Sequence, residues 1–189
     1  VMACRMRIGA DGAIHGHSFL RGLIKSAARL TYEQIQAAHD GRPDYATGPL
    51  MDAVVGPLYA CWKALAAARY RRAPLNLDMP ELQVALDDAG VVEAITPRAR
   101  LDSHRLIEDM MIAANVCAAE TLEKHDTPLL YRVHDEPGRE KLSALREFLS
   151  SINLGFSKAD AVRPNHFNDV LGKARSANKA EQVSEMVLR

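Results

Sequence analysis

The stretch LDSHRLIEDMMIAANVCAAETLE, residues 101–123, constrains the fold more than any other part of the sequence. Asp102 or Ser103 can begin a helix there, because either side chain can accept a hydrogen bond from the first free backbone N–H groups. Apolar residues then recur at the spacing of one wide, buried helix face. They are Leu106, Ile107, Met110, Ala113, Ala114, Cys117 and Ala118. We therefore expect a long central helix, with Met110 and Ile112 in the protein core.

Three polar residues of the same stretch fall near one line along the helix. His104, Glu108 and Asn115 follow one another at intervals of four and then seven residues, which keeps them on one side of the cylinder. An imidazole, a carboxylate and an amide on a mostly buried helix need hydrogen-bond partners. From this helix alone, those partners are either other protein groups or a ligand, and both interpretations stay open.

Composition narrows the class of protein. The chain has 24 basic and 24 acidic residues, which argues against a broadly cationic nucleic-acid binder but allows a local basic channel. Cys4, Cys61 and Cys117 are scattered and form neither a zinc nor a disulfide framework, which favours the reducing cytoplasm. We find no uninterrupted apolar run of about 18 residues, so we expect no membrane span. The N-terminus has no secretory signal pattern.

The remaining pattern predicts an α+β fold, with a small antiparallel sheet packed against several helices. Alternating or β-rich runs predict strands at residues 4–8, 14–24, 73–77, 82–86, 91–96 and 129–134. Capping signals and helical periodicity predict helices at residues 32–38, 51–71, 101–123, 141–151, 165–174 and 179–188. No break in composition marks a domain boundary.

Both ends of the chain are abrupt. Val1 begins in what reads as the middle of a strand, and MVLR ends the chain within a helix that has no C-cap. We therefore expect the chain to be cut from a longer polypeptide. A small protein with frayed ends is the alternative.

Familiar catalytic motifs do not explain this sequence. It contains no GxGxxG, Walker, GxSxG, HExxH or DxDxDG pattern. His15 and His17 alternate on one predicted strand, but without a third ligand at suitable spacing they indicate an exposed polar face rather than a metal site. The pair Asp87-Asp88 lies in a predicted turn, where carboxylates are common. We predict no metal ligands in this chain.

Basic residues gather in two places. Residues 62–72 contain no acidic residue, and residues 1–30 contain only Asp11. The basic residues of the two patches are Arg5, Arg7, Arg21, Lys25, Arg29, Lys63, Arg69, Arg71 and Arg72. Such patches suit a polyanion held in a groove, and a solvated surface explains them equally well. Tyr32 follows Arg29 closely and can place a ring in such a groove for stacking, or can pack at a helix start.

Five segments together resemble a known family. They are KSAARLTY at 25–32, RAPLNLD at 72–78, LIEDMMIAAN at 106–115, TPLLYRVH at 127–134 and EKLSALREF at 140–148. In this order and spacing they resemble the RNB catalytic domain of the ribonuclease II superfamily, and in particular its ribonuclease R-like exoribonucleases. The resemblance covers nearly the whole chain.

The resemblance implies a processive, Mg²⁺-dependent enzyme that hydrolyses single-stranded RNA from its 3′ end to nucleoside 5′-monophosphates. We expect a cytoplasmic protein, with neither DNA nor a membrane as partner. The resemblance further implies that Tyr32 lies beside the terminal nucleotides and that Glu108 lies in the same cavity. His104 and Asn115, from the helix geometry, and Arg29, from the basic patch, are further candidates for substrate binding. Leu77 falls near the position of a base-stacking aromatic residue in some members.

The resemblance also implies what the chain lacks. The family's metal-binding aspartates precede the segment that matches Val1, and its catalytic arginine follows the segment that matches Arg189. We therefore expect an internal piece of the catalytic domain, without catalytic or metal-binding residues and inactive alone. A non-catalytic RNA-binding or scaffolding module is the alternative. A helix-turn-helix DNA binder built from the last three helices is disfavoured by the balanced charge of residues 165–188.

Overall fold

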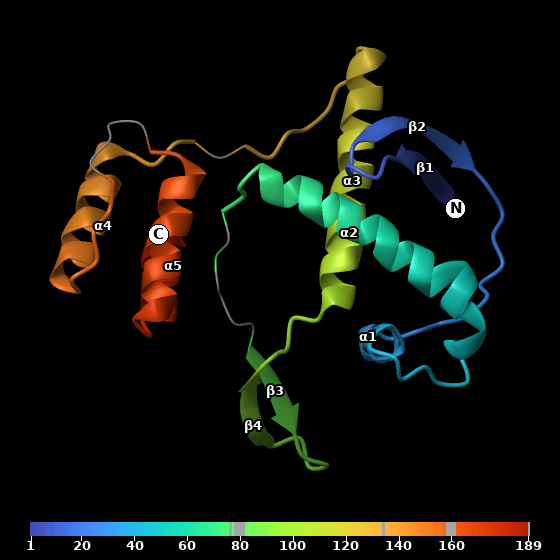
Figure 1. Ribbon diagram of the computed structural model, residues 1–189, viewed down its shortest axis with the longest axis horizontal. Helices are drawn as coiled ribbons and strands as arrows, with labels where there is room; N and C mark the ends of the chain where they lie inside the picture. The colour runs from blue at the N-terminus through green and yellow to red at the C-terminus, as the bar shows by residue number, and fades with distance from the viewer. Residues whose placement is uncertain (76, 78–81, 134, 158–161, 189) are drawn as a thin grey trace. The chain divides into compact units, whose positions relative to one another are not determined.

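The computed structural model describes residues 1–75, 77, 82–133, 135–157 and 162–188. The chain divides into two compact units. Unit 1 consists of Val1–Arg72 and Ala99–Tyr131, and unit 2 consists of Ala73–Arg98 and Arg132–Arg189. Each unit combines one β-hairpin with helices, which confirms the predicted α+β class (Figure 1).

The strands of the described residues form two separate hairpins rather than one sheet. In unit 1, β1 (Met2–Ile8) pairs antiparallel with β2 (Ile14–Arg21), and in unit 2, β3 (Leu82–Leu86) pairs with β4 (Val92–Pro97). The first hairpin packs on helices of its unit. The second leaves more than half of the Leu82, Val84 and Ile95 side chains exposed, so it adds little to a core.

Unit 1 contains the helices that build the candidate site. They are α1 (Tyr32–His39), the short turns η1 (Gly48–Leu50) and η2 (Met51–Val55), α2 (Gly56–Arg71) and α3 (Asp102–Lys124). A capping box starts α1, since Thr31 Oγ1 accepts from the Gln34 N–H at 3.2 Å and Gln34 Oε1 accepts from the Thr31 N–H at 2.9 Å. The first side chain after this cap is Tyr32, so the cap fixes where its ring leaves the backbone.

Helix α3 is the predicted long helix, but its buried face differs from the prediction. Its cap is Leu101 rather than Asp102 or Ser103. Leu106, Ala113 and Cys117 are buried as expected. Met110 is half-buried, whereas Ile107, Met111, Ile112 and Val116 are exposed. Placing Ile112 in the core was therefore wrong, because the helix is apolar on two sides and its spacing does not show which side packs.

The core of unit 1 lies where α2 crosses α3 (Figure 1). Val55, Tyr59, Trp62 and Leu106 form its buried cluster, with Ile35 of α1 packed against it. The helical segment Gly48–Arg71 is long and apolar enough to cross a membrane by length and composition, although Asp52 and Lys63 interrupt its apolar run. Tyr59 and Trp62 of this segment, however, are buried in this core.

Unit 2 is held by three helices. They are α4 (Arg139–Ser151), α5 (Pro164–Ser176) and α6 (Ala180–Leu188). Their buried side chains form one cluster, made of Leu145, Leu149, Val170, Leu171, Ala174 and Val183. Leu77 packs against this cluster, so its side chain serves packing within unit 2.

Two predicted strands are wrong wherever their residues are described. Residues 129–133 form no strand, and Leu130 is fully exposed. Residues 73–75 and 77 also lie outside strands, and Ala73 has a φ of 47°, which a strand cannot accommodate. His134, Asn76 and the motif residues 78–81 lie outside the described residues. Apolar content alone suggested both strands, and no partner strand pairs with either described segment.

Gly12 lies where the first hairpin packs closely on α2. Its φ is 78°, and a Cβ there would lie 2.2 Å from the backbone oxygen of Ala64. Gly41 has a similar φ of 86° but open space around it. We predict that Gly41→Ala lowers the free energy of unfolding by about 1–2 kcal/mol from backbone strain, and that Gly12→Ala lowers it by about 1–3 kcal/mol more from overpacking.

Urea denaturation of both variants of the 189-residue chain measures the difference. Equal losses for the two variants would show that the hairpin does not approach α2 this closely.

Candidate functional site

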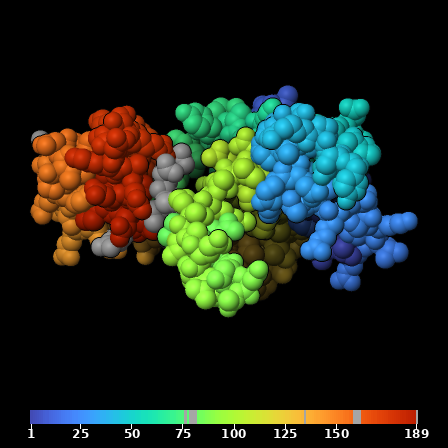
Figure 2. Space-filling model, turned by 90° about the horizontal axis from the view of Figure 1, so that it is seen from below, coloured from blue at the N-terminus to red at the C-terminus, as the bar shows by residue number. Residues whose placement is uncertain are grey.

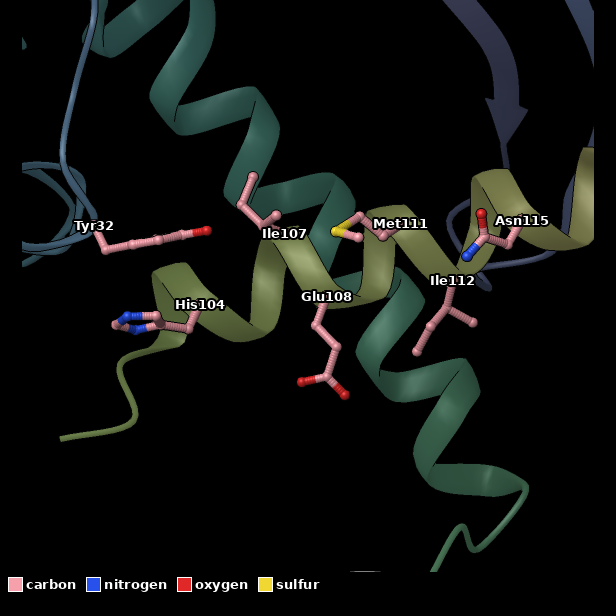
Figure 3. A pocket seen from close by; sticks show the side chains of 7 residues that line it. All are labelled: Tyr32, His104, Ile107, Glu108, Met111, Ile112 and Asn115. Carbon is pink, nitrogen blue, oxygen red and sulfur yellow. The ribbon is translucent and has the colours of Figure 1, made fainter. Parts of the chain in front are cut away.

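An open cavity of about 320 Å³ lies along one side of α3. Figure 3 shows the seven side chains around it, which are Tyr32, His104, Ile107, Glu108, Met111, Ile112 and Asn115. All belong to unit 1. The polar residues predicted on one line of the helix thus share a single cavity with Tyr32. Their roles in binding remain predictions.

The rings of Tyr32 and His104 form one end of the cavity. They stack with centroids 4.2 Å apart and planes inclined by 21°, as Figure 3 shows. The start of α1 is tied to the start of α3, because Gln36 Oε1 accepts a hydrogen bond from the Ser103 N–H at 3.1 Å. This tie holds the two rings in register, and Tyr32 keeps 38% of its surface exposed.

The two nitrogens of His104 differ in their contacts. Nδ1 accepts a hydrogen bond from the Leu101 N–H at 3.2 Å, so in the neutral ring the proton sits on Nε2. Nε2 is buried and has no hydrogen-bond partner among the described residues. His104 therefore caps α3 and packs against Tyr32.

Glu108 is held by two arginines. Oε1 accepts from both Nη atoms of Arg69 at 3.1 Å, and Oε2 accepts from Nη2 of Arg100 at 2.5 Å. Partial burial acts to raise the pKa of Glu108, but the hydrogen bonds from Arg100 and Arg69 outweigh it and lower the pKa below its usual value. Glu108 therefore stays ionised, and sequence reasoning missed both of its partners.

Asp109 joins the same network from the buried side of α3. Oδ1 accepts from Arg69 Nη1 at 2.6 Å, and Oδ2 accepts from the indole N–H of Trp62 at 2.9 Å. Arg69 thus links two adjacent carboxylates of α3 to α2, and these hydrogen bonds raise its own pKa. A signal was available in the sequence, since Trp62 and Arg69 lie two helical turns apart and so share one face of α2.

The two basic patches differ in how far their side chains are exposed or paired. The side chains at residues 21–29 are exposed, and Figure 2 shows the blue N-terminal segments of unit 1 at the surface. Arg29 is among these exposed residues and does not line the cavity. The patch at residues 62–72 is partly neutralised, because Arg69 pairs with acids of α3 and Arg71 donates to the backbone carbonyl of Asp11. Two of the four basic residues of that patch are therefore engaged by other groups of the protein.

The described residues do not fit a Mg²⁺ site. Among the described residues, no group of three or more His, Cys, Asp or Glu side chains is arranged to hold a metal. Glu108 and Asp109 are oxygen donors of the kind Mg²⁺ prefers, but the guanidinium of Arg69 bonds to both and would repel a cation. His17 is also engaged, since its Nε2 lies 2.9 Å from Thr121 Oγ1.

A protein-family model that matches the whole chain identifies the class of protein. The family model of the RNB domain matches residues 1–189, and the chain belongs to this family. Two relatives are ribonuclease R of Escherichia coli, 31% identical over 192 residues, and ribonuclease R of Vibrio parahaemolyticus, 30% identical over 190 residues. Each match covers 100% of this chain and 23% of the relative, so the chain spans about a quarter of their length.

A solved structure has the same fold. The apo form of Mycoplasma genitalium RNase R superposes with a TM-score of 0.88 at 20% sequence identity. The match covers 98% of this chain and 29% of that one. The resemblance that the sequence predicted is therefore confirmed at the level of family and fold.

The bridge from Arg69 to Asp109 should stabilise unit 1. We predict that Arg69→Met lowers the free energy of unfolding by about 2–3 kcal/mol, because it leaves the buried Asp109 carboxylate without a charged partner. Arg105→Met is the matched control, since it removes an exposed ion pair with Asp102 and should lose less than about 1 kcal/mol.

Denaturant unfolding measures both variants. Adding Asp109→Asn to Arg69→Met should recover part of the loss, because the unpaired charge is then gone. Equal losses for the two arginine variants would contradict a stabilising role for the bridge.

Proposed function

We propose that this chain forms part of a ribonuclease R-like enzyme that degrades single-stranded RNA from its 3′ end to nucleoside 5′-monophosphates, and that it lines the RNA channel. The observation that carries the proposal is the cavity in which Tyr32, His104, Glu108 and Asn115 meet. Membership of the RNB family supports it. So do the neighbours of known structure, since Mycoplasma genitalium RNase R has been solved with ribose-methylated single-stranded RNA and with double-stranded RNA.

The cavity suits one nucleotide of a strand. Its volume of about 320 Å³ lies near the lower end of the range of about 300–1,000 Å³ in which proteins hold small ligands. Tyr32 offers an aromatic face, and Ile107, Met111 and Ile112 offer apolar walls. Base–aromatic stacking contributes about 1–3 kcal/mol per base. The walls thus favour a flat, partly apolar ligand such as a nucleobase.

Polar groups at the cavity supply the rest of the recognition. Each carboxylate oxygen has two lone pairs, so Glu108 Oε2, which accepts one bond from Arg100, can accept another from a ribose hydroxyl. Asn115 carries an amide at the opposite end of the cavity from Tyr32 (Figure 3). The exposed basic side chains of residues 21–29, Arg29 included, attract the phosphates of the strand.

The hydrolytic step belongs to groups outside this chain. Mg²⁺ ions would activate water and stabilise charge on the phosphate, and the resemblance assigns their aspartate ligands, and the catalytic arginine, to segments with no counterpart in this sequence. We therefore also propose that the 189-residue chain alone is inactive. A cytoplasmic location is part of the proposal and rests on the scattered, unpaired cysteines.

A non-catalytic RNA-binding or scaffolding module is the second candidate. It rests on the same cavity and on the exposed basic segment at residues 21–29, both of which serve binding without cleavage. The sequence of the parent gene distinguishes the two, because an enzyme requires the aspartate cluster upstream.

The chain should bind RNA through Tyr32. We predict that fluorescence anisotropy of a labelled oligoadenylate detects binding that weakens as salt rises, and that Tyr32→Ala weakens it about tenfold, the equivalent of one lost base stack. Tyr70→Ala is the matched control, because Tyr70 is 84% exposed on α2 and does not line the cavity. Equal effects of the two substitutions, or no binding at low salt, would count against the proposal.

The chain should not cleave RNA. We predict no Mg²⁺-dependent release of nucleoside monophosphates from a labelled oligonucleotide, measured by chromatography, under conditions where binding is detected. A Mg²⁺-dependent activity that releases nucleoside monophosphates and co-purifies with the chain would refute the proposal that the catalytic groups lie outside this chain.

A further inference from the structure

Arg69 makes contacts with Glu108 that an ordinary surface ion pair lacks. Two of its N–H groups converge on one oxygen, Oε1, at 3.1 Å each. A guanidinium is planar and rigid, so two convergent bonds from it hold the Oε1 atom in place. Glu108 reaches the cavity from the exposed side of α3, and Arg69 reaches Glu108 from α2.

Arg69 is itself anchored. Its Nη1 also bonds to Asp109 Oδ1 at 2.6 Å, and Asp109 is 8% exposed and bonded to the Trp62 indole. The buried Asp109 carboxylate therefore holds the guanidinium on one side, and Glu108 contacts the guanidinium on the other side. Arg100, the other partner of Glu108, has only one N–H on Oε2 and a side chain 55% exposed, so it constrains the carboxylate less.

We propose that Arg69 is a positioning residue for ligand recognition, which fixes the Glu108 carboxylate so that Oε2 is presented to a sugar hydroxyl of the nucleotide in the cavity. The inference deepens the proposed function and rests on it. Arg69 does not line the cavity, so it acts through Glu108 rather than on the ligand. No local sequence motif reveals this role, because Arg69 and Glu108 are 39 positions apart in the sequence.

The chemistry of the ligand provides a specific measurement. RNA carries a 2′-hydroxyl that DNA lacks, so a correctly held Glu108 favours RNA over a DNA strand of the same sequence. Loss of fold or of general charge weakens binding to both strands alike. The ratio of the two affinities therefore reports the orientation of Glu108 and does not report stability.

The experiment measures this ratio by anisotropy with oligoadenylate and oligodeoxyadenylate, using the 189-residue chain with its fold verified by circular dichroism. The wild-type chain should prefer RNA, and Arg69→Met should reduce the preference about tenfold, near the lower end of the effect of one hydrogen bond to a charged group. Arg69→Lys keeps the charge without the planar fork and should restore the preference only in part. Arg100→Met should reduce it less than about twofold, because it removes a single exposed bond.

A double substitution shows whether Arg69 acts through Glu108. Glu108→Gln alone should reduce the RNA preference as much as Arg69→Met does, and combining the two should reduce it no further. Additive effects, or equal losses for Arg69→Met and Arg100→Met, would overturn the positioning role while leaving the proposed function intact. A wild-type chain that binds RNA and DNA equally would overturn the recognition role of Glu108 and this inference with it.

Discussion

The buried carboxylate of Asp109 is the contact on which the arrangement of unit 1 depends. A buried charge is tolerated only when it is paired and hydrogen-bonded. Asp109 meets this requirement with the Trp62 indole and the Arg69 guanidinium, both from α2. These two bonds fix which turn of α2 faces which turn of α3. Apolar contacts between the helices would allow several such alignments, because they are not directional.

The same contact connects the core to the cavity. Asp109 faces inward and Glu108, its neighbour, faces the cavity, and Arg69 bonds to both. The orientation of a group at the surface is thus set by a group in the interior. Tyr32 is fixed from another direction, by the capping box of α1 and by the tie from Gln36 to the start of α3. The cavity is therefore lined by α1 and α3, and α2 contacts its wall from behind through Arg69.

Several elements could be predicted because their signals are local. The Thr31–Gln34 capping box, the turn at Gly12 and the extent of α3 all depend on residues within one or two turns of each other. The shared position of His104, Glu108 and Asn115 followed from helical periodicity alone. The strand predicted at residues 129–134 failed because a strand needs a partner strand, and apolar composition does not report whether one is present.

The sequence by itself determined the helices, the hairpin turns, the line of polar residues on α3 and the family, since each depends on residues near one another or on their order. Only the tertiary structure decided that Ile112 lies on the exposed side of α3 and that Leu77 packs in unit 2. It also decided that Arg69 forms ion pairs with Glu108 and Asp109 instead of adding to an exposed basic patch. These outcomes depend on pairings between distant segments. Many pairings satisfy the same local pattern, and burial and charge compensation select among them.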